Sequence, residues 1–146
     1  MASFPQSNAP SAAAINWALL LIRIASALAF LYHGSAILFG AFGGPGPERF
    51  AAYMHAPAAV GYLVGLAQVG GGLAMLVGIF VRVATVALII VMLGAIFLVH
   101  LPHGFDIGKG GLEYALTQLL IALAVLIAGP GSYSLSARLP GRLQKL

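Results

Sequence analysis

The chain has 146 residues, of which 61% are hydrophobic and only 7% are charged, and its formal net charge at pH 7 is +4. Soluble domains carry about 25% charged residues, so this composition excludes a water-soluble globular domain and predicts a single-domain integral membrane protein. The basic residues form no run that would favour nucleic acid as a partner, and the absence of cysteine excludes thiol–disulfide chemistry and thiolate-held clusters.

Apolar stretches in chain order predict an all-α integral membrane four-helix bundle. Residues 1–12 read as a flexible N-terminal leader and not as a cleaved signal, because no basic residue precedes the long apolar run. A helix over 57–101 would be about 65 Å long, twice the bilayer core, so we predict a turn near 79–83. The predicted spans, each near the roughly 20 residues that cross a membrane, are about 13–42, 57–79, 83–101 and 111–128. They make a membrane domain over 13–130, followed by a cytoplasmic tail over 131–146.

The basic residues near the span ends predict the orientation. The larger group consists of Arg82, Arg138, Arg142 and Lys145, and the smaller group consists of Arg49 and Lys109. The side with more Lys and Arg faces the cytoplasm, so both termini are expected inside and the loops around 43–56 and 101–110 outside.

Small residues in the second span suggest close helix packing. Gly61 and Gly65 are four residues apart, and Gly70, Ala74 and Gly78 repeat the spacing. Such series let helix backbones approach closely inside a membrane, so we expect both to lie at helix interfaces.

Arg23 lies within the first span, where a charge is costly unless it faces the bundle interior. At 100° per residue, Arg23, Ser26, Phe30 and His33 share one face of this helix. Gln68 and Gln118 are expected at a depth that Arg23 can reach. Two interpretations stay open: a structural clamp that donates to these glutamines and to free carbonyls, or a group that binds an anion or substrate.

All four histidines and Glu113 are expected at the outer end of the bundle, which predicts a polar, outward-opening pocket there. The candidates for its lining are His33, His100, Glu113, Tyr32, Tyr114 and His103. Three ionisable groups at one depth are tolerable only if they are paired, hydrated or liganded.

Each pocket candidate also has a plain structural interpretation. His33 can donate to a neighbouring carbonyl, and Glu113 can serve as a favourable charge at a helix N-terminus. His33 and His100 could hold haem between them, but this rests on depth alone. A zinc or copper site from histidine and Glu113 is an equal alternative, and we assign no metal.

Five segments in a fixed order carry a family likeness: "RIASALAFLYHG", "GYLVGLAQVGGGLAMLVGIFVR", "HLPHGF", "GGLEYAL" and "GPGSYSL". Together, over about residues 20–135, they resemble the DoxX family of small bacterial membrane proteins. The resemblance implies a four-span bundle in the bacterial inner membrane, and it places in the family's polar motifs Arg23, Tyr32, His33, His100, Gly104, Glu113 and Tyr114. The family often has an acidic residue in the middle of the second span, where this chain has Gln68, so a buried arginine–carboxylate pair is not available there.

The family name comes from a membrane enzyme that oxidises thiosulfate and passes electrons to quinone, and other members resemble accessory subunits of redox complexes. The leading hypothesis is therefore a redox-associated inner-membrane protein, an accessory or quinone-interacting subunit with lipid and a protein partner around it. Quinone is the leading candidate ligand, ahead of haem. The alternatives are a non-catalytic scaffold or anchor for a partner enzyme and, more weakly, a small-solute transporter, which the lack of broken-helix repeats disfavours. Whether the chain is itself an enzyme stays open.

Overall fold

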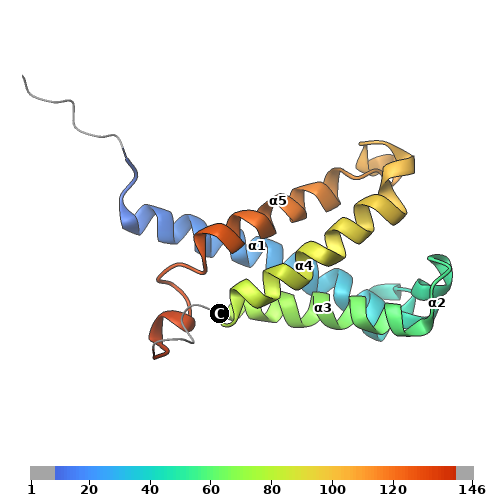
Figure 1. Ribbon diagram of the computed structural model, residues 1–146, viewed down its shortest axis with the longest axis horizontal. Helices are drawn as coiled ribbons and strands as arrows, with labels where there is room; N and C mark the ends of the chain where they lie inside the picture. The colour runs from blue at the N-terminus through green and yellow to red at the C-terminus, as the bar shows by residue number, and fades with distance from the viewer. Residues whose placement is uncertain (1–8, 141–146) are drawn as a thin grey trace, which may run out of the picture.

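A computed structural model describes residues 9–140 of the chain, and these residues are helical with no strand among them (Figure 1). The α-helices are α1 (Ala12–Phe39), α2 (Gly46–Tyr53), α3 (Ala58–Val77), α4 (Val81–Ala95) and α5 (Glu113–Ala128). The short helices are η1 (Ala41–Gly43), the π-helical turn η2 (Ile96–His100), η3 (Leu101–His103), η4 (Ile107–Lys109) and η5 (Ser136–Arg138). The all-helical class predicted from composition and apolar runs is confirmed.

Three of these helices are long and apolar enough to cross a membrane within the described residues: Ala12–Phe39, Ala58–Val77 and the continuous stretch Val81–His103. The fourth, α5, is apolar but has 16 residues, so it is roughly 24 Å long against a bilayer core of about 30 Å. Its helix begins at Glu113, not at the predicted residue 111. Helix length and apolar composition therefore directly support three membrane spans.

Glycines in the left-handed conformation end the first two long helices. Gly40 has a φ of 67° and stops α1 at Phe39, three residues before the predicted end. Gly78 has a φ of 77° and stops α3 at Val77, and α4 begins at Val81 after a short turn. Helices commonly end at a glycine that adopts this conformation without steric cost. The turn predicted near 79–83 thus lies slightly earlier, at 78–80.

A seam of glycines brings α3 against α1 and α2. A Cβ atom on Gly65 would lie 2.8 Å from the Cβ of Leu38, and one on Gly61 would lie 2.0 Å from the carbonyl oxygen of Pro47. Gly34 of α1 makes the reciprocal approach to α3. The predicted packing role of Gly61 and Gly65 is therefore confirmed. The prediction for Gly70 is wrong, because a Cβ there would meet nothing within 4 Å and the residue is exposed.

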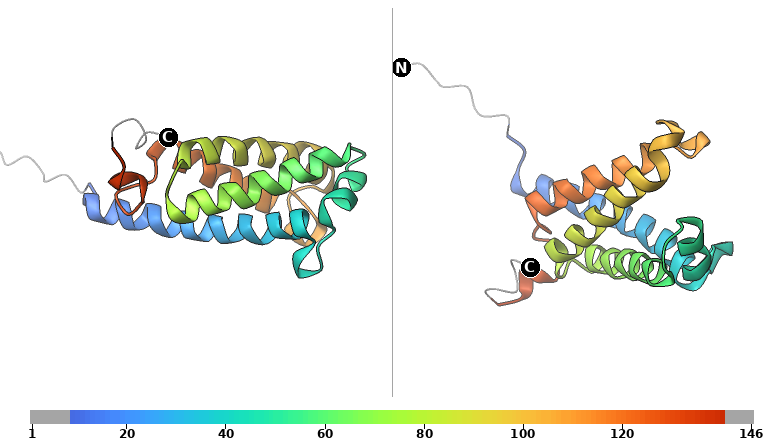
Figure 2. Two further views of the ribbon diagram at one scale, coloured as in Figure 1. Left: turned by 90° about the horizontal axis from the view of Figure 1, so that it is seen from below. Right: turned by 45° about the vertical axis from the view of Figure 1, so that its right-hand side comes forward.

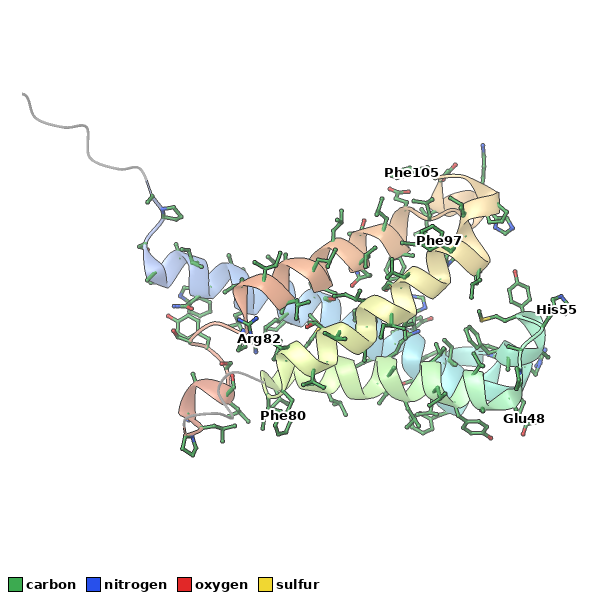
Figure 3. All side chains as sticks on the ribbon, viewed as in Figure 1. Glu48, His55, Phe80, Arg82, Phe97 and Phe105 are labelled. Carbon is green, nitrogen blue, oxygen red and sulfur yellow. The ribbon has the colours of Figure 1, made fainter. Side chains whose placement is uncertain are left out.

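The helices form two arms that meet at one end and diverge at the other (Figures 1 and 2). The first arm consists of α1, α2 and α3, and the second consists of α4, η2 and α5. We call the end with the α3–α4 turn and residues 129–140 the closed end, and the end with α2 and the α4–α5 connection the open end. Figure 3 shows Arg82 toward the closed end, and Glu48 and Phe105 on different arms at the open end. Both ends of the described chain lie at the closed end.

Candidate functional site

A cavity of about 730 Å³ is lined by residues of both arms, including residues of α2 and of the α4–α5 connection at the open end. It is of the size of a small-molecule pocket, and it is lined mainly by apolar side chains, as such pockets are. Every α-helix contributes to this lining, which includes Phe30, Ile37, Phe50, Met54, Val64, Ala67, Val91, Met92, Gly94, Val99 and Ala115. The polar side chains of the lining are His33, Gln68, His100 and Tyr114, from four different helical segments.

Two buried polar atoms on the cavity lining lack a hydrogen-bond partner within residues 9–140: Oε1 of Gln68 and the hydroxyl oxygen of Tyr114. Unpaired buried polar groups cost about 1–3 kcal/mol each, so they are rare in folded proteins and call for an explanation. A ligand in the cavity with a polar group of its own would supply the partner that the protein does not.

The histidines on the lining differ in how they are held. The rings of His33 and Tyr114 have centroids 5.1 Å apart, so α1 and α5 bring these two together. Nδ1 of His100 donates to the carbonyl oxygen of Gly110 at 2.7 Å. Because a carbonyl only accepts, Nδ1 carries a hydrogen, and in the neutral ring Nε2 is then an acceptor. His100 is the last residue of the π-helical turn η2, a feature found frequently at functional sites.

The other three pocket candidates lie outside this lining. Glu113 accepts from the backbone N–H of Ile107 at 3.3 Å and so holds the α4–α5 connection. Tyr32 is 51% exposed and stacks on Phe42 at a centroid distance of 4.8 Å. Nδ1 of His103 donates to the carbonyl oxygen of Val99 at 2.9 Å. Among residues 9–140, no group of three or more His, Asp or Glu side chains could hold a metal ion.

Arg23 is only 1% exposed and is held by backbone carbonyl oxygens near the closed end. Its Nε donates to Met75 at 2.8 Å, and one terminal nitrogen donates to Pro130 and, at 3.1 Å, to Tyr133. In the described part of the chain its donors thus go to carbonyl groups and not to the glutamines expected from depth. The planar guanidinium suits this role, because its donors point in several fixed directions at once.

Gln118 and Gln68 have different surroundings despite their similar predicted depth. Oε1 of Gln118 accepts from the hydroxyl of Ser26 at 2.7 Å, which links α5 to α1. Ser26 belongs to the predicted inward face with Arg23 and Phe30, and all three are at most 1% exposed. Helical periodicity predicted that Ser26 faces the bundle interior. The sequence does not say which glutamine approaches Ser26, so the hydrogen bond to Gln118 could not be predicted.

The cavity lining also includes residues that no sequence pattern marked as candidates. Phe50 and Met54 come from α2 and its C-terminal cap, a short helix that lies in a segment expected to be a loop. Gly94 borders the cavity, and a Cβ there would meet nothing within 4 Å, so its missing side chain adds to the open volume. A glycine of this kind looks in the sequence like any other glycine of a membrane helix.

Long apolar helices around an apolar cavity define a helical membrane protein. The DoxX family matches residues 18–101, which is more than half of the chain, and the chain belongs to this family. The resemblance drawn from the sequence motifs is thereby confirmed. The matched segment includes Arg23, His33, Gln68 and His100, whereas Tyr114 follows it.

The chain is also similar to the Uncharacterized membrane protein Rv3486 of Mycobacterium tuberculosis (strain ATCC 25618 / H37Rv). The two are 38% identical over 109 residues, which cover 66% of this chain and 66% of the relative. The chain thus spans about two thirds of that relative's length. No solved structure matches the chain.

Proposed function

We propose that this protein binds an isoprenoid quinone in the cavity between its arms and serves a membrane oxidoreductase system as a quinone-interacting or accessory subunit. The observation that carries the proposal is the pair of unpartnered polar atoms on an otherwise apolar lining, Oε1 of Gln68 and the hydroxyl of Tyr114. A quinone carbonyl accepts from the Tyr114 hydroxyl, and a quinol hydroxyl donates to Gln68. One cavity thus provides partners for both redox forms of the ring.

The histidines on the lining suit the protons that accompany quinone chemistry. His33 borders the cavity and is exposed, so it can exchange protons with the outside. Imidazole titrates near neutral pH, which allows it to accept and release a proton under physiological conditions. His100 offers its second nitrogen as an acceptor, since the first is bonded to Gly110. The chain has no cysteine with which to hold an iron–sulfur cluster, and we place the electron donor on a protein partner.

The shape of the cavity suits a ligand with a long apolar tail. Leu63 of α3, Ile90 of α4 and Leu98 of η2 border it, and they are 66%, 65% and 72% exposed. These side chains therefore face both the cavity and the surroundings of the bundle. In a bilayer this seam between the arms opens toward hydrocarbon, where the tail of a quinone lies.

We further infer that α5 completes a fourth span, that both termini are cytoplasmic, and that the protein resides in the bacterial inner membrane. Arg82 and Arg138 lie toward the closed end, and Arg49 and Lys109 lie on elements of the open end, as the positive-inside rule would have them. Reporter fusions after Lys145 and within residues 43–50 should report opposite sides of the membrane. The same side for both would contradict this topology.

Filling the cavity tests the quinone proposal. Gly94→Leu places a side chain in the cavity without a clash, because nothing lies within 4 Å of the added Cβ. The matched control is Gly70→Leu, at an exposed helix position that is equally open and lies away from the cavity. Each change replaces glycine inside a helix and should raise intrinsic helix stability by a similar amount.

We expect purified protein in lipid nanodiscs to bind a ubiquinone or menaquinone analogue, and Gly94→Leu to weaken that binding at least tenfold while Gly70→Leu leaves it unchanged. Binding is measured by the ligand-dependent rise in melting temperature and by quinone retained after purification. Equal affinity in both variants would overturn the assignment to this cavity. No binding by the unaltered chain would overturn the quinone proposal and leave the scaffold or anchor alternative.

A further inference from the structure

A second, smaller pocket of about 340 Å³ lies at the closed end, away from the proposed quinone site. It is bordered by Arg23 and Arg138, by Ser132, Tyr133 and Ser134, and by the C-terminal end of α3. The backbone N–H groups of Leu135 and Ser136 donate to the carbonyl oxygens of Val77 and Gly78. These hydrogen bonds hold the segment around Ser134, which borders the pocket, against the α3–α4 turn. Arg23 and Arg138 thus border one space on a backbone that is held in place.

The distribution of charge leaves this end without a side-chain carboxylate. The chain has three acidic residues in all, Glu48, Asp106 and Glu113. Glu48 is in α2, and the other two are in the α4–α5 connection and at the start of α5, so all three belong to the open end. The closed end holds Arg23, Arg82 and Arg138, and no salt-bridging side chain of the chain is near enough to neutralise them.

The carbonyl partners of Arg23 occupy Nε and one terminal nitrogen but do not cancel the charge of the guanidinium. Its second terminal nitrogen has only a 3.5 Å approach to the carbonyl oxygen of Leu76, at the limit of a hydrogen bond. A buried charge in an apolar bundle costs several kcal/mol unless an opposite charge is close. The positive-inside rule accounts for exposed basic residues at a cytoplasmic end, but it does not account for a buried one.

We infer that this pocket binds a phosphate-type oxyanion between Arg23 and Arg138. Guanidinium groups recognise phosphate through charge-assisted hydrogen bonds. Here the weakly bonded terminal nitrogen of Arg23 and the guanidinium of Arg138 are the donors for it. The phosphate has two sources, the headgroup of an anionic phospholipid at the membrane surface or free inorganic phosphate. The inference is independent of the quinone proposal, because the two pockets share no residue.

The test uses Arg138→Gln, which removes one guanidinium and leaves the buried Arg23 and its carbonyl partners in place. The matched control is Arg49→Gln, at an exposed arginine of α2 at the open end. Each protein is placed in phosphatidylcholine nanodiscs with or without phosphatidylglycerol. Its melting temperature is recorded, with added inorganic phosphate as a separate arm at constant ionic strength.

If phosphatidylglycerol raises the melting temperature, and if Arg138→Gln loses this rise while Arg49→Gln retains it, the ligand is a lipid headgroup. A rise with inorganic phosphate that shows the same dependence on Arg138 supports free phosphate. In either case we expect the apparent affinity to fall at least about tenfold in Arg138→Gln, the loss of one charge-assisted contact. No rise in either arm, or an equal loss in both variants, overturns the inference.

Discussion

At the closed end, the buried guanidinium of Arg23 donates hydrogen bonds to the carbonyl oxygens of Met75, Pro130 and Tyr133. On the cavity between the arms, Gln68 and Tyr114 each keep a buried polar atom that no described residue pairs. The polar atoms of Arg23 are therefore hydrogen-bonded where the arms meet, although its charge is not neutralised there, whereas two polar atoms stay unpaired on the cavity where the arms diverge. This contrast separates the polar residues that stabilise the fold from those that remain unpaired for a ligand to bind.

The largest effect is expected from Arg23→Ala. The substitution buries no charge but leaves three carbonyl groups at the closed end without their donor, so the free energy of unfolding should fall on the order of 3 kcal/mol or more. Arg23→Lys should also be destabilising, because an ammonium on one flexible stem cannot reproduce the fork of the guanidinium. Thermal unfolding in detergent measures both, with the exposed Arg49→Ala as a control that should melt like the unaltered protein. An unchanged melting curve for Arg23→Ala would refute the role of Arg23 in closing this end.

Substitutions of the two glutamines should differ in their effect on the free energy of unfolding, and this difference is expected to be of intermediate size. Gln118→Met removes the acceptor of the Ser26 hydroxyl and should lower the free energy of unfolding by about 1–2 kcal/mol. Gln68→Met removes an unpaired oxygen at nearly constant volume, so stability should be unchanged or slightly higher, while quinone affinity falls. Melting curves and quinone titration on the same pair of variants check the contrast. If Gln68→Met were the more destabilising of the two, the contrast between hydrogen-bonded and unpaired polar side chains would fail.

The smallest effect is expected from Tyr114→Phe, which deletes a single buried hydroxyl without a partner. Stability without ligand should rise by up to about 1 kcal/mol, since the cost of burying that group disappears. Quinone affinity should fall roughly threefold to tenfold, the value of one hydrogen bond to the ligand. Tyr32→Phe is the matched control, because Tyr32 lies outside the cavity and is exposed. A loss of affinity in both variants alike would argue against a specific contact with Tyr114.

Much of the fold could be predicted from the sequence, because apolar length and glycine position are local signals. The ends of α1 and α3 fall at Gly40 and Gly78, and the inward face through Arg23, Ser26 and Phe30 follows from helical periodicity alone. The 16-residue length of α5 was less visible, since residues 111 and 112 are not charged and read as part of the apolar run. The short helix α2 was missed because its sequence is rich in glycine, proline and charge.

The site was harder to predict, because equal depth in a membrane does not mean contact when helices diverge. His33 and Glu113 were expected at one level, yet Glu113 turns to the backbone of its own connection. The partners of Arg23 are backbone carbonyls, which exist at every residue and leave no mark in a sequence. The void beside Gly94 likewise depends on how the arms separate, a property of the assembled bundle and not of any one segment.

Arg23 hydrogen-bonds to residues far along the chain, so these bonds can form only late in synthesis. Its contacts with Pro130 and Tyr133 join residues 107 and 110 positions apart, so they form only after α5 has left the ribosome. Until then a buried guanidinium lacks part of its acceptor set, and the nascent bundle is held together less firmly. A chain that stops short of residue 130 should therefore be cleared rapidly by membrane proteases, whereas a completed chain persists, and pulse-chase labelling would show the difference. Arg23 thus joins the first span to the segment after α5, a link that only a chain extending past Tyr133 can make.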